Sequence, residues 1–425
     1  MARIFAEAFG CSSNFADYEI ASGLLKQHGF ELVYSPEDAD IIVILTCVVK
    51  TPTENKMIRR IKEHKALNKP LVVAGCMSKA EQWLVEDIAP DASLLGPDAI
   101  FKVAEVVDET LKGSKVRCLE NLRTPKTCLP RVRVNPIVHI APIASGCLGN
   151  CSYCIVKLAR GRIFSYSSDS IVEDTSMAIS SGAREIWVTA QDTAAYNAEG
   201  VLLPELLKRV SALEGQFRIR VGMMTPNLAL PILGDLIKAF QAENVFKFLH
   251  VPVQSGNDEI LDRMNRQYTV DDFIKLAARF KEQIPGLSLS TDIICGFPGE
   301  TQDQFRDSIQ LVEEVEPDVL NISRFGARPG TEAAHLGWQV PGWEIKRRST
   351  LLADRWRKIA RELNEKWLGW KGEVLVDEEG KAGSWVGRNY SYKPVVLKEK
   401  LSLGSFVEAK VYGIRPQYLL ATTLS

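Results

Sequence analysis

The run Ser145-Gly146-Cys147-Leu148-Gly149-Asn150-Cys151-Ser152-Tyr153-Cys154 places three cysteines in a Cys-x-x-x-Cys-x-x-Cys pattern. It follows the apolar stretch 137–144, which predicts a β-strand. Three thiolates at this spacing can hold three irons of a 4Fe-4S cubane and leave the fourth iron open to a chelating molecule. A zinc site would need a fourth Cys or His nearby, which the sequence does not offer. Buried core thiols are the other alternative, and we favour the cluster on Cys147, Cys151 and Cys154.

Strand and helix patterns alternate on the carboxyl side of this run. Strands are expected at 137–144, 185–190, 217–222, 246–253, 287–294 and 318–323, with helices between them. Six such units predict an α/β fold with a partial (β/α)6 barrel, whose active site lies at the carboxyl ends of the strands.

Polar residues and glycines occur at or near the ends of these strands. Amide, carboxylate and hydroxyl groups there can bind the amino acid and ribose of a nucleoside, and a glycine permits close approach to a flat ring. The candidates are Gln191, Asp192, Gln254, Ser255, Asp292 and Gly296. Asp292 has a second interpretation as a buried capping residue, and His250 is more readily a core histidine than a catalytic one. Arg160 can meet a phosphate or a carboxylate, or belong to a solvated face.

The N-terminal part also alternates strands and helices. Strands are expected at 3–9, 41–46 and 71–75, and helices at 14–27, 52–64, 78–87 and 98–111. Such repeats predict a parallel sheet with helices on its faces.

Three further cysteines follow the three strands of this part. Because the carboxyl ends of parallel strands share one edge of a sheet, Cys11, Cys47 and Cys76 are expected to lie together despite their separation in sequence. We infer a second three-thiolate cluster with one open iron. The alternative is that these cysteines are small core residues.

The segment 116–136 is rich in Pro, Arg and Lys and is expected to be a linker. It contains Cys118 and Cys128, which have no partner at ligand spacing. The predicted domains are therefore 1–115, 137–367 and 368–425.

The C-terminal part begins after a long basic helix expected at 345–367. Five short strands then predict a small β-barrel of the oligonucleotide-binding type. Aromatic residues interleaved with basic ones suit stacking on unpaired bases beside phosphate contacts. The candidate RNA contacts are Arg388, Tyr390, Lys393 and Arg415. An aromatic core with a basic surface is the alternative.

Composition places few further limits on function. Of the 425 residues, 46% are hydrophobic and 25% charged, which is typical of a globular protein. No apolar run is long enough to cross a bilayer and no signal peptide is recognisable, so we expect a cytoplasmic protein without a membrane partner. Nine cysteines in such a protein favour metal binding over disulfides. The net charge of −1 gives no overall attraction to nucleic acid.

These motifs form a larger set along the chain. The set comprises Gly10-Cys11-Ser12-Ser13-Asn14, residues 47–54, Ala74-Gly75-Cys76, residues 145–154, Ala159-Arg160-Gly161, residues 189–196, 249–255 and 291–300, and Arg328-Pro329-Gly330-Thr331. With them, nearly the whole chain resembles the radical S-adenosylmethionine (SAM) methylthiotransferases, in particular the archaeal and eukaryotic threonylcarbamoyladenosine tRNA methylthiotransferase branch. Lys50-Thr51-Pro52 is the main pointer to this branch over the isopentenyladenosine branch.

The resemblance implies a methylthiotransferase domain, a radical-SAM barrel and a TRAM RNA-binding domain, with two [4Fe-4S] clusters and SAM as cofactors. The implied reaction inserts a methylthio group at carbon 2 of N6-threonylcarbamoyladenosine next to the tRNA anticodon. The cluster on Cys147, Cys151 and Cys154 would cleave SAM to a 5′-deoxyadenosyl radical, and the other cluster would hold the sulfur. The implied partners are the tRNA anticodon loop, a flavodoxin- or ferredoxin-like electron donor and a sulfur source.

Three alternatives remain at this point. The same chemistry could act on isopentenyladenosine in tRNA or on a ribosomal-protein aspartate. A non-catalytic iron–sulfur RNA-binding protein would need fully ligated clusters, yet both cysteine sets stop at three.

Overall fold

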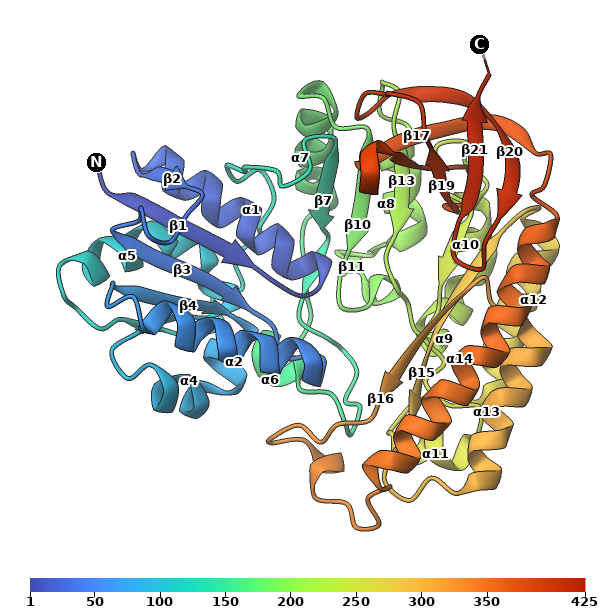
Figure 1. Ribbon diagram of the computed structural model, residues 1–425, viewed down its shortest axis with the longest axis horizontal. Coiled ribbons are helices and arrows are strands. Elements are labelled where there is room, and N and C mark those ends of the chain that lie inside the picture. The colour runs from blue at the N-terminus through green and yellow to red at the C-terminus, as the bar shows by residue number, and fades with distance from the viewer. Residues whose placement is uncertain (425) are drawn as a thin grey trace.

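The computed structural model describes residues 1–424 and shows three parts (Figure 1). An N-terminal sheet domain lies on the left of the view, a partial barrel fills the centre and right, and a small closed barrel sits above the partial barrel. The predicted α/β class and all three architectures are confirmed.

The N-terminal domain is a six-stranded parallel sheet in the order β2-β1-β3-β4-β5-β6. Its strands are β1 (Arg3–Ala8), β2 (Glu31–Val33), β3 (Ile41–Thr46), β4 (Leu71–Gly75), β5 (Ser93–Leu95) and β6 (Arg117–Cys118). The short strands β2, β5 and β6 carry too few residues to show a pattern in the sequence. Strand β6 lies within the predicted linker, so the sheet extends to Cys118, three residues past the predicted boundary at 115.

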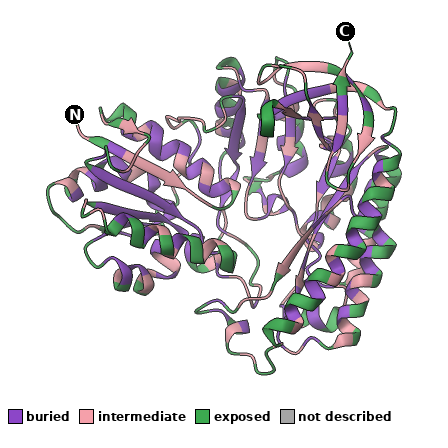
Figure 2. Cartoon of the chain, viewed as in Figure 1, coloured by how far each residue is buried: buried purple, intermediate pink, exposed green. Residues whose placement is uncertain are grey.

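Helices cover both faces of this sheet. They are α1 (Ser12–Gln27), α2 (Thr51–Lys65), α3 (Cys76–Ala80), α4 (Gln82–Ile88), η1 (Pro97–Lys102) and α5 (Val103–Leu111). Helices α1 and α5 pack on one face, and α2, α3 and α4 on the other. Every residue of β3 and β4 is buried, as the purple central strands in Figure 2 show, because both strand faces meet helices.

The partial barrel consists of two three-stranded parallel sheets, β7-β10-β13 and β14-β15-β16. Their bounds are β7 (Val138–Pro142), β10 (Glu185–Thr189), β13 (Arg218–Val221), β14 (Phe248–His250), β15 (Ser288–Cys295) and β16 (Val319–Arg324). A parallel bridge between Ile219 and Val245 joins the two sheets. No pairing closes β7 onto β16 within residues 1–424, so the barrel is open on that side.

Helices pack on the outer face of the barrel strands. They are α7 (Ser168–Ser180), α8 (Leu203–Ser211), α9 (Pro226–Ala229), η3 (Leu230–Ile232), α10 (Leu233–Phe240), α11 (Asp258–Arg263), α12 (Val270–Gln283), α13 (Gln302–Val315) and α14 (Gly342–Glu365). Smaller elements in the connections are β8 (Ala144–Ser145), α6 (Val156–Arg160), β9 (Phe164–Ser165), η2 (Thr193–Ala195), β11 (Asn197–Ala198), β12 (Val201–Leu202) and η4 (Glu332–Ala334). Across residues 1–424, none of the helices combines the length and the apolar character needed to span a membrane.

Helix α1 of the N-terminal domain packs beside edge strand β7 of the barrel. Phe15 and Ala16 on this helix belong to the same apolar cluster as Ile137, Val138 and Ile140. The sheet domain thereby covers the barrel at one of its unpaired edges, which brings the carboxyl edges of the two sheets close together.

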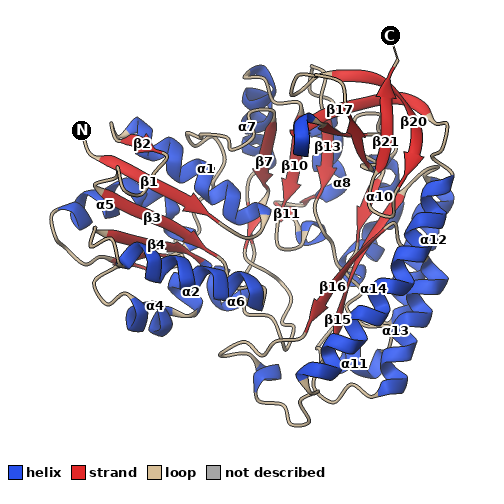
Figure 3. Cartoon of the chain, viewed as in Figure 1, coloured by secondary structure: helices blue, strands red, loops and turns tan. Residues whose placement is uncertain are grey.

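The C-terminal part is a closed five-stranded barrel in the order β17-β18-β19-β21-β20 (Figure 3). Its elements are β17 (Lys371–Glu379), η5 (Lys381–Gly383), β18 (Trp385–Arg388), β19 (Pro394–Leu397), β20 (Phe406–Ile414) and β21 (Leu419–Thr423). It contacts the large barrel where the strands begin: Tyr392 donates to Glu185, the first residue of β10, and Lys393 pairs with Asp318, just before β16. The small barrel therefore closes the amino edge of the large one, the edge opposite the predicted active site.

This placement corrects two of the predicted RNA contacts. The ammonium of Lys393 is buried, 2.8 Å from Asp318 and 2.7 Å from the Asn364 side chain. The guanidinium of Arg388, whose side chain is partly exposed, donates to Asp377 of the neighbouring strand β17 at 2.8 Å. Lys393 thus holds the two barrels together, whereas Arg388 pairs within the small barrel, and in both cases a carboxylate already neutralises the charge that was predicted to meet phosphate. Among the predicted contacts, Arg415 and Tyr390 remain exposed.

Candidate active site

One large cavity of about 1310 Å³ lies between the N-terminal domain and the carboxyl edge of the partial barrel. Its wall includes residues at or just past the ends of β10, β13, β14, β15 and β16. The N-terminal domain adds residues that follow β1, β3 and β4. The cavity thus forms where the carboxyl edges of two parallel sheets face each other.

The three N-terminal cysteines come together at this cavity. Strands β1, β3 and β4 are neighbours, so Cys11 at the start of α1, Cys47 after β3 and Cys76 at the start of α3 share one edge of the sheet. Asn14 fastens two of the strand ends by donating to the carbonyls of Phe9 and Leu45. Cys11 and Cys76 line the cavity.

The second cysteine set lies in the loop between β8 and α6. Cys147, Cys151 and Cys154 all line the same cavity. The loop folds back tightly, with the Cys147 amide donating to the Gly161 carbonyl. Gly146 at the start of this turn has φ +81°, and a Cβ there would lie 2.3 Å from the Arg162 carbonyl oxygen. Only glycine fits this position.

The space around both sets suits a group larger than one ion. Within residues 1–424, no three Cys, His, Asp or Glu side chains converge on a point where a single ion would sit. A Cβ at Gly149 would lie 3.6 and 3.8 Å from the sulfurs of Cys147 and Cys151, so the glycine leaves the room between them open. Burial raises the pKa of both Cys76 and Cys154 to about 12, so these thiols become thiolates only against a positive group such as an iron–sulfur core.

Two of the predicted nucleoside-binding residues lie at the end of β10. Gln191 lines the cavity and donates to Ser13 of the N-terminal domain at 3.1 Å. Asp192 lines the cavity as well, and its carboxylate accepts from the Thr225 hydroxyl at 2.6 Å. Burial raises the pKa of Asp192 to about 6, against the opposing effect of these hydrogen bonds.

Two more of the predicted residues lie past β14 and in the second half of β15. Gln254 lines the cavity with φ +74°, a strained conformation for a non-glycine residue. Asp292 accepts hydrogen bonds from His250 at 3.1 Å and from Asn321 at 2.6 Å. Burial would raise the pKa of Asp292, yet these bonds and the charge of Lys50 hold it below its ordinary value. His250 also lines the cavity, so interpreting it as a core residue misses its position.

Ser255 and Gly296 lie outside the cavity wall, which corrects their prediction as nucleoside contacts. Ser255 is fully buried, and its hydroxyl accepts from the Asn257 amide. Gly296 instead allows α14 to pack closely, because a Cβ there would lie 2.4 Å from the Ile345 side chain.

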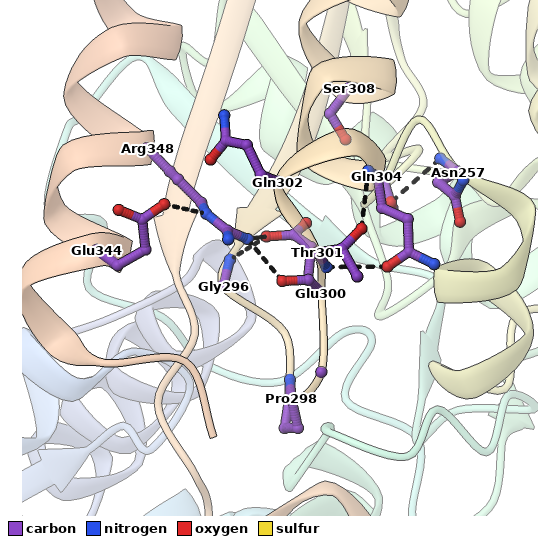
Figure 4. A network of polar contacts seen from close by, with 12 residues as sticks. Asn257, Gly296, Pro298, Glu300, Thr301, Gln302, Gln304, Ser308, Glu344 and Arg348 are labelled. Carbon is purple, nitrogen blue, oxygen red and sulfur yellow. Dashed lines mark hydrogen bonds and ion pairs between the residues drawn. The ribbon is translucent and has the colours of Figure 1, made fainter. Parts of the chain in front are cut away.

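A buried network holds the turn that begins at Gly296. As Figure 4 shows, the Glu300 carboxylate accepts from the Gly296 amide at 2.8 Å and from Arg348 of α14 at 2.7 Å. Burial raises the pKa of Glu300 despite these contacts. The sequence Gly-Phe-Pro-Gly-Glu at 296–300 therefore braces α14 against the barrel.

Several cations on the cavity wall were not predicted as site residues. The cationic residues of the wall are Lys50, Arg160, Arg220, Arg266, Arg324 and Arg328. Arg328 pairs with Glu54, and the Arg220 guanidinium packs over three aromatic rings. Arg324 is the last residue of β16, and Arg266 follows α11. Their position just past predicted elements at the carboxyl edge is the signal that could have identified them.

A buried ion triad ties the cavity wall to the linker. Asp17 of α1 contacts Lys126 at 2.5 Å and Arg160 of α6 at 2.8 Å, and all three side chains are at most 4% exposed. The triad joins the N-terminal domain, the linker and the helix that follows the Cys147–Cys154 loop. Of the alternatives considered for Arg160 (a phosphate, a carboxylate or a solvated face), the structure therefore shows contact with a carboxylate.

Replacing Asp17 by asparagine is expected to lower the free energy of unfolding by about 3–5 kcal/mol, because two buried cations lose the carboxylate with which they pair. Urea unfolding followed by circular dichroism measures the change. Asp40→Asn, which breaks an exposed pair with Arg3, is the control and should leave the unfolding midpoint in place. An Asp17→Asn protein as stable as the parent would contradict the role of the triad.

The chain matches three known families along its length. Residues 142–312 match the Radical SAM superfamily, residues 3–96 match the Uncharacterized protein family UPF0004, and residues 368–424 match the TRAM domain. These segments correspond to the partial barrel, the N-terminal sheet and the small closed barrel.

Curated relatives align over nearly the whole chain. It is 43% identical to the probable threonylcarbamoyladenosine tRNA methylthiotransferase of Methanothermobacter thermautotrophicus, over 99% of both chains. The protein of that name from Pyrococcus abyssi is 41% identical over 100% of both chains. The human threonylcarbamoyladenosine tRNA methylthiotransferase is 37% identical, over 96% of this chain and 72% of the human one.

Solved structures with a similar fold are more distant in sequence. The radical S-adenosylmethionine methyltransferase TsrM from Kitasatospora setae aligns with a TM-score of 0.61 and 14% identity, over 79% of this chain and 77% of that one. The cobalamin-dependent S-adenosylmethionine radical enzyme OxsB aligns with a TM-score of 0.56 and 11% identity, over 84% and 56%. At these identities the likeness concerns the fold alone.

Proposed function

The chain belongs to the threonylcarbamoyladenosine tRNA methylthiotransferase family of radical SAM enzymes, and we propose that it inserts a methylthio group at carbon 2 of N6-threonylcarbamoyladenosine in tRNA. The observation that carries this proposal is that cysteines of both three-thiol sets line one cavity. Sulfur insertion needs two activities at one place, a centre that activates SAM and a centre that presents sulfur. A single cavity between the two sheets supplies both.

Cys147, Cys151 and Cys154 would hold the [4Fe-4S] cluster that binds SAM, and Cys11, Cys47 and Cys76 a second such cluster. When bound, these groups supply the reductive cleavage of SAM and the transferable sulfur, which side chains alone cannot provide for an aromatic C–H bond. The proposal requires an external electron donor of the flavodoxin or ferredoxin type and a sulfur source.

We assign the remaining polar residues of the wall to binding and orienting SAM. Gln191, Asp192 and Gln254 offer amide and carboxylate groups to the amino acid and ribose of SAM. Asp292 is held in place by His250 and Asn321, so its carboxylate keeps one direction toward the cavity. The Gln191 bond to Ser13 couples the SAM side of the cavity to the N-terminal domain.

The charge of the wall favours threonylcarbamoyladenosine over an isopentenyl substrate. The threonylcarbamoyl group carries a carboxylate, whereas the isopentenyl group is apolar. Lys50 and Arg324 line the cavity, are exposed, and form no ion pair with any residue in the described range 1–424. The Arg324 Nε donates to Ser349 at 2.8 Å, which leaves its terminal nitrogens for a ligand. An anionic substrate group would supply the ion-pair partner that Lys50 and Arg324 lack.

Replacing Lys50 or Arg324 by methionine is expected to lower kcat/KM for tRNA carrying threonylcarbamoyladenosine about 10- to 100-fold. The estimate corresponds to the loss of a hydrogen bond to a charged group, about 1.5–3 kcal/mol. Rates on the natural tRNA and on an RNA whose threonyl carboxylate is a methyl amide measure the effect.

Lys56→Met is the matched control, because Lys56 is an exposed lysine on the same helix as Thr51 and lies over the Phe9 ring outside the cavity wall. It should retain the parental rate. If Lys50→Met loses as much on the neutral amide as on the natural substrate, Lys50 does not recognise the carboxylate.

Mass spectrometry of tRNA nucleosides tests the function itself. A strain lacking the gene should lose 2-methylthio-N6-threonylcarbamoyladenosine and accumulate the unmethylthiolated nucleoside. An unchanged nucleoside profile would reject the proposed function.

A further inference from the structure

The Arg266 side chain contacts one of the cluster cysteines directly. Its Nη1 donates to the Cys151 sulfur at 3.0 Å. Arg266 lies in the loop between α11 and α12, and it is partly exposed into the cavity that it lines. No other arginine in residues 1–424 makes a hydrogen bond to a cysteine sulfur of either set.

The remaining donors of this guanidinium are fixed by the protein. Its Nε donates to the Tyr268 hydroxyl at 2.7 Å, and its Nη2 reaches the Pro252 carbonyl at 3.4 Å. The Tyr268 hydroxyl is itself directed at the carbonyls of Pro252 and Val253 at the end of the β14 segment. The planar fork is therefore held in one orientation, with the terminal nitrogen Nη1 pointing at the sulfur.

Arg266 has no carboxylate partner in the part of the chain that the structure describes. The buried arginines of the chain do have one: Arg160 pairs with Asp17, Arg328 with Glu54 and Arg348 with Glu300. An enclosed cation without a counter-charge is costly. The anionic group within contact of Arg266 is Cys151, once that cysteine is a thiolate.

We propose that Arg266 is a positioning residue that supplies the counter-charge for the cluster on Cys147, Cys151 and Cys154 and raises its reduction potential. This inference rests on the proposed function. Reduction adds one electron from an external low-potential donor and breaks no bond, so the cluster with its three thiolates becomes more negative by one charge. A fixed positive charge and a hydrogen bond at a ligand sulfur both stabilise that more negative state.

The test is a redox titration that needs neither SAM nor RNA. Full-length protein carrying Cys11→Ala, Cys47→Ala and Cys76→Ala retains one cluster. The solution potential is set with dithionite, and the amount of reduced cluster at each potential is measured by electron paramagnetic resonance. In Arg266→Gln, the ratio of reduced to oxidised cluster at a fixed potential should fall about tenfold, a negative midpoint shift of about 59 mV for one electron. Arg266→Lys keeps the charge but not the planar guanidinium, so its midpoint potential should lie between those of the parent protein and Arg266→Gln.

Arg279→Gln is the matched control, because it removes the same charge from an exposed ion pair with Glu282 on α12. It should keep the parental midpoint. A loaded Arg266→Gln cluster with the parental midpoint would overturn the inference and leave the proposed function standing.

If Arg266→Gln binds no iron, Tyr268→Phe decides the question. That variant removes the hydroxyl that holds the Arg266 Nε, and its midpoint should shift in the same negative direction by a smaller amount. A parental midpoint there would overturn the inference. A parent protein that itself assembles no reducible cluster would reject both the inference and the proposed function.

Discussion

Replacing Cys147, Cys151 and Cys154 together by alanine is expected to abolish release of 5′-deoxyadenosine from SAM by the dithionite-reduced protein. These three thiols are the only cysteines in the loop between β8 and α6, and all of them line the cavity. Without them no protein ligand remains for the SAM-binding cluster. Iron per chain after anaerobic reconstitution should fall from about eight to about four, since each cubane contains four irons. Chromatography of the SAM products and an iron and sulfide assay measure both effects.

The chain provides its own control for cysteine loss. Cys118 in β6 and Cys128 in the linker lie outside the cavity wall. A Cys118→Ala, Cys128→Ala double variant should keep the full iron content and the parental rate of SAM cleavage. Continued formation of 5′-deoxyadenosine by the triple-alanine variant would show that SAM is activated elsewhere.

The matching change at the other set is expected to separate SAM cleavage from sulfur insertion. With Cys11, Cys47 and Cys76 replaced by alanine, the protein should still release 5′-deoxyadenosine but form no methylthiolated nucleoside. The physical reason is that the two sets come from different domains: these cysteines follow strands of the N-terminal sheet, whereas the loop that would bind SAM belongs to the barrel. Iron per chain should again fall to about four.

Two results would contradict this assignment. Retained methylthio product in the variant would mean that the sulfur comes from another centre. Complete loss of SAM cleavage in a variant with four irons and a parental circular dichroism spectrum would mean that the N-terminal cysteines serve SAM activation itself. Liquid chromatography with mass spectrometry of the digested tRNA and of the SAM products distinguishes the two.

Sequence reasoning predicted the convergence of the cysteines because one local rule applied. A cysteine directly after a buried strand of a parallel sheet lies at the carboxyl edge, and β1, β3 and β4 are neighbours, so Cys11, Cys47 and Cys76 meet. The same rule placed Gln191, Asp192 and Gln254 on the wall, whereas Asp292 reaches the wall from inside strand β15.

The rule fails where a side chain's direction depends on a distant element. Gly296 follows β15 as required, but its missing Cβ makes room for Ile345 of α14, far along the sequence. Arg388 and Lys393 have the residue types of an RNA surface, yet Arg388 pairs with Asp377 inside the small barrel, and the docking of that barrel on the large one buries Lys393 against Asp318. Arg266 was missed because its contact to Cys151 joins two loops 115 residues apart.

The position of the small barrel sets a minimum length for the RNA. Helix α14 begins near the cavity, where Ile345 meets Gly296, and ends at the small barrel, where Asn364 contacts Arg415 and Lys393. The helix lines the cavity as far as Ala353, and the 11 residues from there to Asn364 span about 17 Å at 1.5 Å per residue. An RNA that places a base in the cavity and also touches the small barrel must bridge that distance along the outside of the protein. A hairpin trimmed to its loop would be held at one end only.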